Sequence, residues 1–397
     1  MADAEMAIRQ DGSIGVAAAS HEALLARMRI AFAGGGTAGH LMPGVTVATE
    51  LMKRFPDADI VFLGTQGDLE KRVIGGAHLR LQQIYTEKRG GSILNLPVYA
   101  MRSLVSFVRA CRAVREFDPD VLVGLGGFGC VFPVLAASLR RIPTILLEQN
   151  VLPGRANRFL ARWTTEIDCM WSESAAYLGH KTNVCVTGNP VREAVFTCTR
   201  EEAAKFFGLD PNKKTLFVTG GSLGALRMNQ IVIEALPELG KMADELQVIH
   251  CTGDPSYTMV SAAYKGSPLK NYVVNYLDKM PLAYAISDLA ICRAGGTTIA
   301  ELLASGVPSI LIPLPTAAED HQRLNAEAVE HGGAGILAHQ NSLTGEKLAG
   351  IVRELLRGDR LNKMREAATA MARRDAAKAV VERICGQVRE RRLRYAR

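Results

Sequence analysis

The sharpest chemical candidate in the sequence is a carboxylate that follows a glycine turn. Residues 292–301 read Cys-Arg-Ala-Gly-Gly-Thr-Thr-Ile-Ala-Glu, so Glu301 falls one turn into a helix that would begin near Gly295 and Gly296. A carboxylate there can accept hydrogen bonds from both hydroxyls of a ribose, while the turn and the helix dipole favour a phosphate or a base. The segment therefore indicates a nucleotide site. The alternative is an ordinary glutamate at a helix start.

A second glycine-rich turn, Gly34 to Gly39, follows the first strand-like run and leads directly to His40. It contains Gly-x-Gly-x-x-Gly, which lets a backbone approach a phosphate at a helix N-terminus. A dinucleotide site also needs an acidic residue at the end of the next strand, and that run ends in Leu63-Gly64-Thr65. We predict a phosphate or sugar loop rather than a nicotinamide or flavin site. His40 is either a general base or a structural residue.

Four more segments place glycine or polar side chains after a strand-like run, in one case after the loop that follows it, where open α/β sheets bind ligands. They are Gly126-Gly127-Phe128-Gly129, Glu148-Gln149-Asn150, Gly220-Gly221-Ser222 and Asp320-His321-Gln322-x-x-Asn325. Glycine amides and the Ser222 hydroxyl suit a diphosphate, with Arg192 as a bidentate cation, whereas amide side chains suit sugar hydroxyls. Each segment has a structural alternative, such as a tight turn, a helix cap or a surface arginine.

The candidate metal ligands do not form a convincing site. Two triplets, Asp57-Ala58-Asp59 and Asp118-Pro119-Asp120, have the spacing of a metal clamp, but both precede strand-like runs. They would lie away from the ligand cleft, so we predict that the chemistry requires no metal. The eight cysteines are scattered without a Cys-x-x-Cys pair, which is typical of free thiols in a reducing compartment.

Parallel sheets must bring these residues together, and the apolar pattern predicts them. Short apolar runs alternate with stretches of helical period such as 44–54, 225–239 and 297–305. This alternation is typical of parallel sheets covered by helices on both faces. The runs lie at residues 29–33, 59–63, 120–125, 143–147, 183–187, 215–219, 246–251, 288–292 and 308–312.

The two halves of the chain open alike, with Arg29-Ile-Ala-Phe-Ala-Gly-Gly-Gly and Thr215-Leu-Phe-Val-Thr-Gly-Gly-Ser. Each reads as a strand, a glycine turn and a helix, so we predict two Rossmann-like domains with ligand in the cleft between them. The predicted organisation is a flexible extension over 1–28, a first domain over 29–190, a second over 191–360 and a basic helical tail over 361–397.

The bulk composition suits a two-domain globular protein with an anionic partner. The chain has 397 residues, of which 48% are hydrophobic and 22% charged, and a formal net charge of +7. That charge favours nucleic acid, phosphates or an acidic membrane. Residues 121–139 carry no charge, but their glycines and Pro133 favour a strand, a turn and a helix over a membrane span. Residues 1–28 lack the pattern of a secretory signal.

Residues 89–117 combine apolar and basic side chains, as a helix that rests on anionic headgroups would. The alternative is an amphipathic helix of the core. The residues concerned are Leu94, Leu96, Val98, Met101, Leu104, Val105 and Phe107, together with Arg89, Arg102, Arg109, Arg112 and Arg115.

Taken together and in this order, the motifs resemble the MurG family. They are Gly-Gly-Gly-Thr-x-Gly-His, Gly-Gly-Phe, Glu-Gln-Asn, Gly-Asn-Pro-Val-Arg, Gly-Gly-Ser-x-Gly-Ala, Cys-Arg-x-Gly…Glu and Asp-His-Gln-x-x-Asn-Ala, between about Arg29 and Arg357. The resemblance implies a GT-B glycosyltransferase fold and an inverting transfer of N-acetylglucosamine from UDP-N-acetylglucosamine. The implied acceptor is the C4 hydroxyl of the muramoyl sugar of undecaprenyl-diphospho-N-acetylmuramoyl-pentapeptide, which converts lipid I to lipid II of peptidoglycan.

The resemblance also implies a peripheral protein at the cytoplasmic face of the cell membrane, with an anionic membrane surface as partner, no nucleic acid and no bound metal or other cofactor. It places Thr37, Ala38, Gly39, Asn150 and Gln322 at the donor sugar, and Arg192 and Ser222 at the diphosphate. It places Leu277, Gly296, Thr297, Thr298, Ile299, Ala300 and Glu301 at uridine. His40 matches the catalytic position, and Gly35, Gly36, Gly126 and Gly127 are candidates for the acceptor diphosphate.

Three positions depart from the family pattern. Ala38 replaces a usual glycine, Leu147 a common histidine and Leu223 a usual glutamine. These changes concern the sugar contacts more than the reaction type. The alternatives are a transferase to another glycolipid, a UDP-N-acetylglucosamine 2-epimerase, which shares the fold, and a nucleotide-sugar-binding protein without chemistry.

Overall fold

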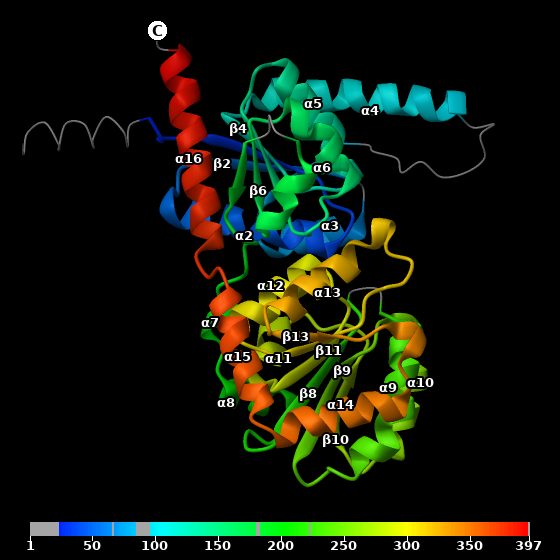
Figure 1. Cartoon of the computed structure of the whole chain (residues 1–397). Coiled ribbons are helices and arrows are strands. Elements are labelled where there is room, and N and C mark those ends of the chain that lie inside the picture. The colour runs from blue at the N-terminus through cyan, green and yellow to red at the C-terminus, as the bar shows by residue number, and fades with distance from the viewer. Residues whose placement is uncertain (1–23, 66, 85–95, 180–182, 222–223, 396–397) are drawn as a thin grey trace, which may run out of the picture.

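The computed structural model of the chain consists of two parallel sheets, each covered by helices, with one domain above the other in Figure 1. It describes residues 24–65, 67–84, 96–179, 183–221 and 224–395. Within these residues, the first sheet has the order β3-β2-β1-β4-β5-β6-β7 and the second the order β10-β9-β8-β11-β12-β13. Every strand pairing is parallel, so the predicted α/β class with two Rossmann-like sheets is confirmed.

All of the predicted apolar runs are strands, within one or two residues at their ends. The first sheet contains β1 (Arg29–Ala33), β2 (Asp59–Gly64), β3 (Arg80–Gln83), β4 (Val121–Gly124), β5 (Thr144–Glu148), β6 (Glu166–Cys169) and β7 (Val184–Val186). The second contains β8 (Lys214–Thr219), β9 (Leu246–Cys251), β10 (Lys270–Val274), β11 (Leu289–Cys292), β12 (Ser309–Leu311) and β13 (Gly335–Leu337).

The helices connect successive strands and cover both faces of each sheet. They are α2 (Ala38–Arg54), α3 (Asp68–Gly76), α4 (Leu96–Phe117), α5 (Val131–Leu139), α6 (Arg155–Leu160), α7 (Ala194–Thr197), α8 (Arg200–Phe207), α9 (Leu226–Gly240), α10 (Tyr257–Lys265), α11 (Met280–Ile286), α12 (Gly296–Ser305), α13 (His321–His331), α14 (Gly345–Arg357), α15 (Arg360–Met371) and α16 (Ala376–Tyr395).

The uncharged segment 121–139 forms β4, a short turn and α5, as predicted. More generally, the helices in the described part of the chain are all too short or too polar to cross a bilayer.

The last two helices pack on different domains. Helix α15 contacts α12 of the second domain, whereas α16 returns to the first domain and lies beside α2 (Figure 1). Val380, Val381 and Ile384 of α16 are fully buried in the core of the first domain. Burial of each such side chain stabilises the fold by roughly 1.5–3 kcal/mol, so α16 is part of that core. The predicted tail segment 361–397 thus holds two helices with separate positions.

Arginines of the same chain form ion pairs with aspartates of the two acidic triplets. Asp120 accepts hydrogen bonds from Arg392 of α16 at 2.6 and 3.1 Å, and Asp118 lies 3.4 Å from Arg391. Asp59 lies 3.7 Å from Arg80. Both triplets therefore neutralise basic side chains at the edge of the sheet opposite the cleft, and the last helix is held there by charge as well as by apolar contact.

Candidate active site

Two cavities meet where the carboxyl ends of the two sheets face each other. One, of about 710 Å³, belongs mostly to the second domain and includes the turn after β8 and the start of α12. The other, of about 950 Å³, lies mostly against the first domain, next to α4, α5 and α6. Thr37, Gly39, Thr297, Thr298 and Gln322 line both. Two ligands bound one in each cavity would thus lie next to each other.

Glu301 sits in the wall of the 710 Å³ cavity within a buried polar network. Its side chain is only 8% exposed, and its two oxygens have different partners. Oε1 accepts from Arg192 at 2.8 and 3.2 Å, and Oε2 accepts from the Tyr284 hydroxyl at 2.8 Å. Burial and the Glu301 charge raise the pKa of Tyr284 well above its usual range, so the phenol stays protonated and donates.

Arg192 carries a full charge at this position. Burial lowers the pKa of its guanidinium, but the Glu301 carboxylate more than offsets that effect and the net shift is upward. Tyr284 was not among the residues that the sequence singled out. It comes from α11, and nothing in its local sequence shows that its hydroxyl points at Glu301.

The glycine turn before α12 brings the two domains into contact. A Cβ added to Gly296 would lie 2.4 Å from the carbonyl oxygen of Gln149, so only glycine allows this approach. Thr297 donates to the carbonyl of Gly39 at 2.6 Å, across the same junction. Ile299 and Ala300 point into the core of the second domain and line neither cavity, whereas Leu277 lines the 710 Å³ cavity.

The turn after β8 supplies backbone groups to the 710 Å³ cavity. Gly220, Gly221 and Gly224 line it, and α9 begins just beyond with its N-terminus toward the turn. This is an arrangement that favours an anion. The predicted diphosphate ligand Ser222, and Leu223 beside it, lie outside the described residues.

Arg293 is a cation of the cavity wall to which the sequence gave no role. It donates to the carbonyls of Ile312 and Pro313 at 3.0 and 3.1 Å and to the Gln340 side chain at 2.7 Å. Burial lowers the pKa of its guanidinium. Among the described residues no carboxylate pairs with it, so its charge adds to the potential that favours an anionic ligand.

His40 lies at the start of α2 and lines the 950 Å³ cavity only. Its Nδ1 lies 2.9 Å from the Thr37 hydroxyl. The ring packs over the second glycine turn, because a Cβ on Gly126 would come within 3.1 Å of its Cδ2 and one on Gly127 within 3.6 Å of Nδ1. The glycines at this turn therefore leave room for the imidazole.

A buried glutamate of α3 occupies the first glycine turn. Glu70 is 1% exposed, and its Oε1 accepts from the backbone N–H of Gly36 at 3.1 Å. A Cβ on Gly35 would collide with the same carboxylate. Gly35, Gly36 and Gly126 line neither cavity, whereas Gly127 lines the larger one. Glu70 lies 34 positions beyond Gly36 in the sequence, and no motif connects it to the loop.

Asn150 belongs to a hydrogen-bonded network that joins the domains. Its backbone N–H and Nδ2 donate to Glu148, and its Oδ1 accepts from Asn325 at 2.9 Å. Asn325 is fully buried and also accepts from the Val151 N–H at 2.9 Å. The Asp-His-Gln-x-x-Asn motif therefore divides: Gln322 and His321 reach the cavity, while Asn325 holds the two domains together.

The structure thus brings most of the predicted ligand residues to the two cavities. Thr37, Ala38, Gly39, Arg192, Leu277, Thr297, Thr298, Glu301 and Gln322 line the 710 Å³ cavity, and Asn150, Gly296 and His40 line the 950 Å³ one. Their individual roles stay predictions.

The chain is similar over most of its length to known transferases. Residues 30–168 match the glycosyltransferase family 28 N-terminal domain, and residues 215–380 match the C-terminal domain of the same family. A protein of Geobacter sulfurreducens is 37% identical over 365 residues, which cover 91% of this chain and 100% of the relative. One of Halothermothrix orenii is 38% identical over 359 residues, covering 87% and 95%. Both are named UDP-N-acetylglucosamine--N-acetylmuramyl-(pentapeptide) pyrophosphoryl-undecaprenol N-acetylglucosamine transferase.

Solved structures agree with the fold. The crystal structure of MurG from Acinetobacter baumannii superimposes with a TM-score of 0.70 at 26% identity, covering 90% of this chain and 99% of that one. A UDP-GlcNAc 2-epimerase from Neisseria meningitidis gives 0.64 at 16% identity, covering 89% and 98%, which shows a shared fold alone. With relatives this similar along nearly its whole length, the chain belongs to glycosyltransferase family 28 and, within it, to the MurG family.

Proposed function

We propose that the protein transfers N-acetylglucosamine from UDP-N-acetylglucosamine to the C4 hydroxyl of the muramoyl sugar of lipid I, forming lipid II. The observation that carries the proposal is the pair of cavities that share Thr37, Gly39 and Thr297. A transferase needs adjoining places for donor and acceptor, whereas an epimerase acts on the nucleotide sugar alone. The name that the relatives share supports the same reaction.

The 710 Å³ cavity is the proposed donor site. Glu301 would accept the ribose hydroxyls, while Arg192, Arg293 and the turn amides at Gly220 and Gly221 would hold the diphosphate. These residues already line the cavity, so they need little reorganisation as negative charge grows on the departing UDP. Binding that strengthens as the glycosidic bond breaks is what accelerates the transfer.

His40 is the proposed general base. It would take the proton from the acceptor C4 hydroxyl while that oxygen attacks the anomeric carbon from the face opposite UDP. The role requires Nε2 to be the unprotonated nitrogen. The Thr37 hydroxyl, 2.9 Å from Nδ1, favours this tautomer when it accepts the Nδ1 proton. Thr37 is then a positioning residue for His40.

A comparison of acceptors tests the proposed reaction. Labelled UDP-N-acetylglucosamine is incubated with the protein and lipid I, with the protein and diacylglycerol, and with the protein alone. We expect a labelled disaccharide lipid with lipid I only. Label in the diacylglycerol product, or interconversion of the nucleotide sugar in the protein-only sample, would instead assign the chain to one of the alternative activities.

Substitution of His40 tests the base. We expect His40→Ala to lower kcat by about 10²–10⁴-fold, the usual contribution of general base catalysis, while UDP-N-acetylglucosamine binding stays near the wild-type value. Full turnover by a variant that still binds donor would reject the assignment. His78→Ala, at a turn after α3, is the matched control and should keep full activity.

Helix α4 is the proposed contact with an anionic membrane, at the cytoplasmic face, where a peripheral protein would meet its lipid acceptor. It projects along the outer side of the first domain in Figure 1. Its apolar side chains Val98, Met101, Leu104, Val105 and Val108 are exposed rather than packed in the core. Arg109, Arg112 and Arg115 are exposed on the same helix. Arg89 and Leu94 of the predicted surface lie outside the described residues.

The position of α4 links this surface to the acceptor cavity. Ser103 of α4 lines the 950 Å³ cavity beside Phe128 and Phe132. Phe107 of the same helix lies 6.0 Å, ring to ring, from Phe132. An apolar wall therefore leads from the exposed helix to the place where the acceptor sugar would react, as a lipid-linked substrate needs.

Vesicle binding tests the membrane contact. We expect the triple variant Arg102→Glu, Arg109→Glu and Arg112→Glu to lose binding to vesicles that contain an anionic phospholipid, because each basic residue near such a surface contributes about 1 kcal/mol. The control carries the same charge change on the second domain, at Arg227, Arg353 and Arg360, and should still bind. Equal binding by both triple variants would reject the role of α4.

A further inference from the structure

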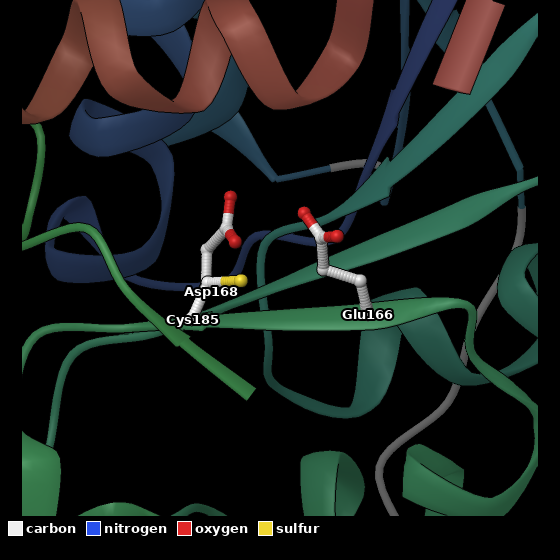
Figure 2. Close-up of side chains that lie close together, drawn as sticks. All are labelled: Glu166, Asp168 and Cys185. Carbon is white, nitrogen blue, oxygen red and sulfur yellow. The ribbon is translucent and has the colours of Figure 1, made fainter. Parts of the chain in front are cut away.

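A cluster of three metal-binding side chains lies outside the active site, on the first sheet beneath α16. Glu166 and Asp168 are two residues apart on β6, so their side chains lie on the same face of the sheet (Figure 2). Cys185 stands opposite Asp168 on the neighbouring strand β7. One carboxylate oxygen from each acid and the Cys185 sulfur all lie within 4.8 Å of one another.

Asp168 gives an independent sign that something is missing from the cluster. Its side chain is 2% exposed, yet neither of its oxygens has a hydrogen-bond partner among the described residues. A buried carboxylate without partners costs several kcal/mol if it is charged. Burial and the neighbouring Glu166 carboxyl group raise the pKa of Asp168 above its usual range. Figure 2 shows its carboxyl group beside the side chains of Glu166 and Cys185.

Glu166 still has an acceptor position left. Arg383 of α16 donates to both of its oxygens, and Asn183 donates to Oε2 at 3.2 Å. A carboxylate has about four acceptor positions, so one remains on Oε1. Cys185 is half-buried on the last strand of the sheet, which gives the cluster a side that solvent can reach.

We propose that Glu166, Asp168 and Cys185 bind a thiophilic divalent cation of the zinc type, with water as a fourth ligand. Carboxylate and thiolate are both zinc ligands, whereas magnesium and calcium take oxygen ligands only. A tetrahedral zinc site sets its ligand atoms roughly 3.3–3.7 Å apart, from bond lengths of 2.0–2.3 Å. Small side-chain rotations draw the three atoms in to that spacing.

The charges of the cluster balance when a dication is bound. The two positive charges of the metal and the Arg383 guanidinium then face three anionic ligands. Arg383 therefore offsets the third anionic ligand instead of competing for the site. The bound ion would join β6, β7 and α16.

Metal retention tests the proposal. The full-length protein is treated with a chelator, dialysed against zinc and desalted, and its metal content is measured. We expect about one equivalent in the wild type and at least about tenfold weaker binding in Cys185→Ser and in Asp168→Asn. Cys198→Ser is the matched control, because Cys198 is also half-buried but lies outside the cluster, and it should bind as the wild type does. Zinc should raise Tm in the wild type and the control only.

Cobalt binding is measured on the unmodified protein, so this test does not require that a variant folds. Co²⁺ bound to a thiolate absorbs in the near ultraviolet through sulfur-to-metal charge transfer, and we expect this band in the unmodified protein. Its absence, or zinc retention by Cys185→Ser equal to that of the wild type, would overturn the proposal. In that case the two carboxyl groups would share a proton and serve only to hold Arg383.

Discussion

Replacement of Tyr284 by Phe isolates one bond of the donor-site network. The substitution removes the hydroxyl that donates to Glu301 Oε2 at 2.8 Å and keeps the ring, which packs 5.7 Å from Phe217. A hydrogen bond to a charged group contributes about 1.5–3 kcal/mol. We therefore expect the free energy of unfolding to fall by about that amount. Glu301 also loses the anchor that orients it toward the cavity, so KM for UDP-N-acetylglucosamine should rise about tenfold, which corresponds to 1.4 kcal/mol.

Tyr264→Phe is the matched control for this substitution. Tyr264 is also buried in the second domain, but its hydroxyl lies 3.2 Å from Nδ1 of His250 and away from either cavity. Burial lowers the pKa of His250 to about 3, so this partner is neutral and the bond contributes only about 0.5–1.5 kcal/mol. The control should lose a little stability and leave KM unchanged.

Urea unfolding and steady-state kinetics at varied donor concentration measure both effects. The expected pattern is a larger stability loss in Tyr284→Phe and a change of KM in that variant alone. An unchanged KM in Tyr284→Phe, with the stability loss present, would show that Glu301 does not need the phenol in order to bind donor. An equal rise of KM in both variants would point to a general loosening of the second domain and would refute the reasoning.

Three further predictions concern the junction and the core. Gly296→Ala should lower kcat/KM at least about tenfold, because its Cβ would meet the Gln149 carbonyl at 2.4 Å, whereas Gly350→Ala in α14, with no heavy atom within 4 Å of the added Cβ, should change it little. Asn325→Ala should lower the free energy of unfolding by about 1–3 kcal/mol in urea titrations, since it leaves the buried Val151 N–H unpaired, and exposed Asn362→Ala should not. His250 has a pKa of about 3 in the folded protein against 6.5 in the unfolded chain. Its contribution to the free energy of unfolding is therefore complete above pH 6.5 and falls by about 1.4 kcal/mol per pH unit as the pH drops toward 3. His250→Gln should remove this slope when unfolding is measured from about pH 7 to 5.

The sequence predicted nine of the described strands from their apolar runs, including β7 at a sheet edge, and missed four for physical reasons. The missed strands are β3, β6, β10 and β13. In β3 only Leu81 is apolar, and β10 begins with the exposed polar residues Lys270 and Asn271, because these strands close the sheets at one edge. β13 is only three residues long. β6 is interior, but Glu166 and Asp168 interrupt its apolar run. The two acidic residues of the proposed cation site are therefore the reason why the apolar pattern did not predict β6.

For the site, the sequence could predict which residues lie at the ends of strands but not which of them contact one another. Ile299 and Ala300 were predicted at uridine because they share a motif with Glu301, yet a helix turns successive residues through about 100°, and these two face the core. Tyr284 and Glu70 reach the site through contacts over long stretches of chain. Such contacts depend on how α3 and α11 pack, and no local pattern encodes that.

Hydrogen bonds across the domain junction fix how the two cavities lie relative to each other. Thr297 donates to Gly39, and Asn325 bonds to Asn150 and Val151, so residues of both domains fix the position of His40 relative to the donor cavity. His40 itself lines only the 950 Å³ cavity. In the proposed mechanism, separation of the domains would leave His40 beside the acceptor and the donor-binding groups beside α12. We therefore expect transfer only when the domains are closed with both substrates bound, and little hydrolysis of UDP-N-acetylglucosamine by water when the acceptor is absent.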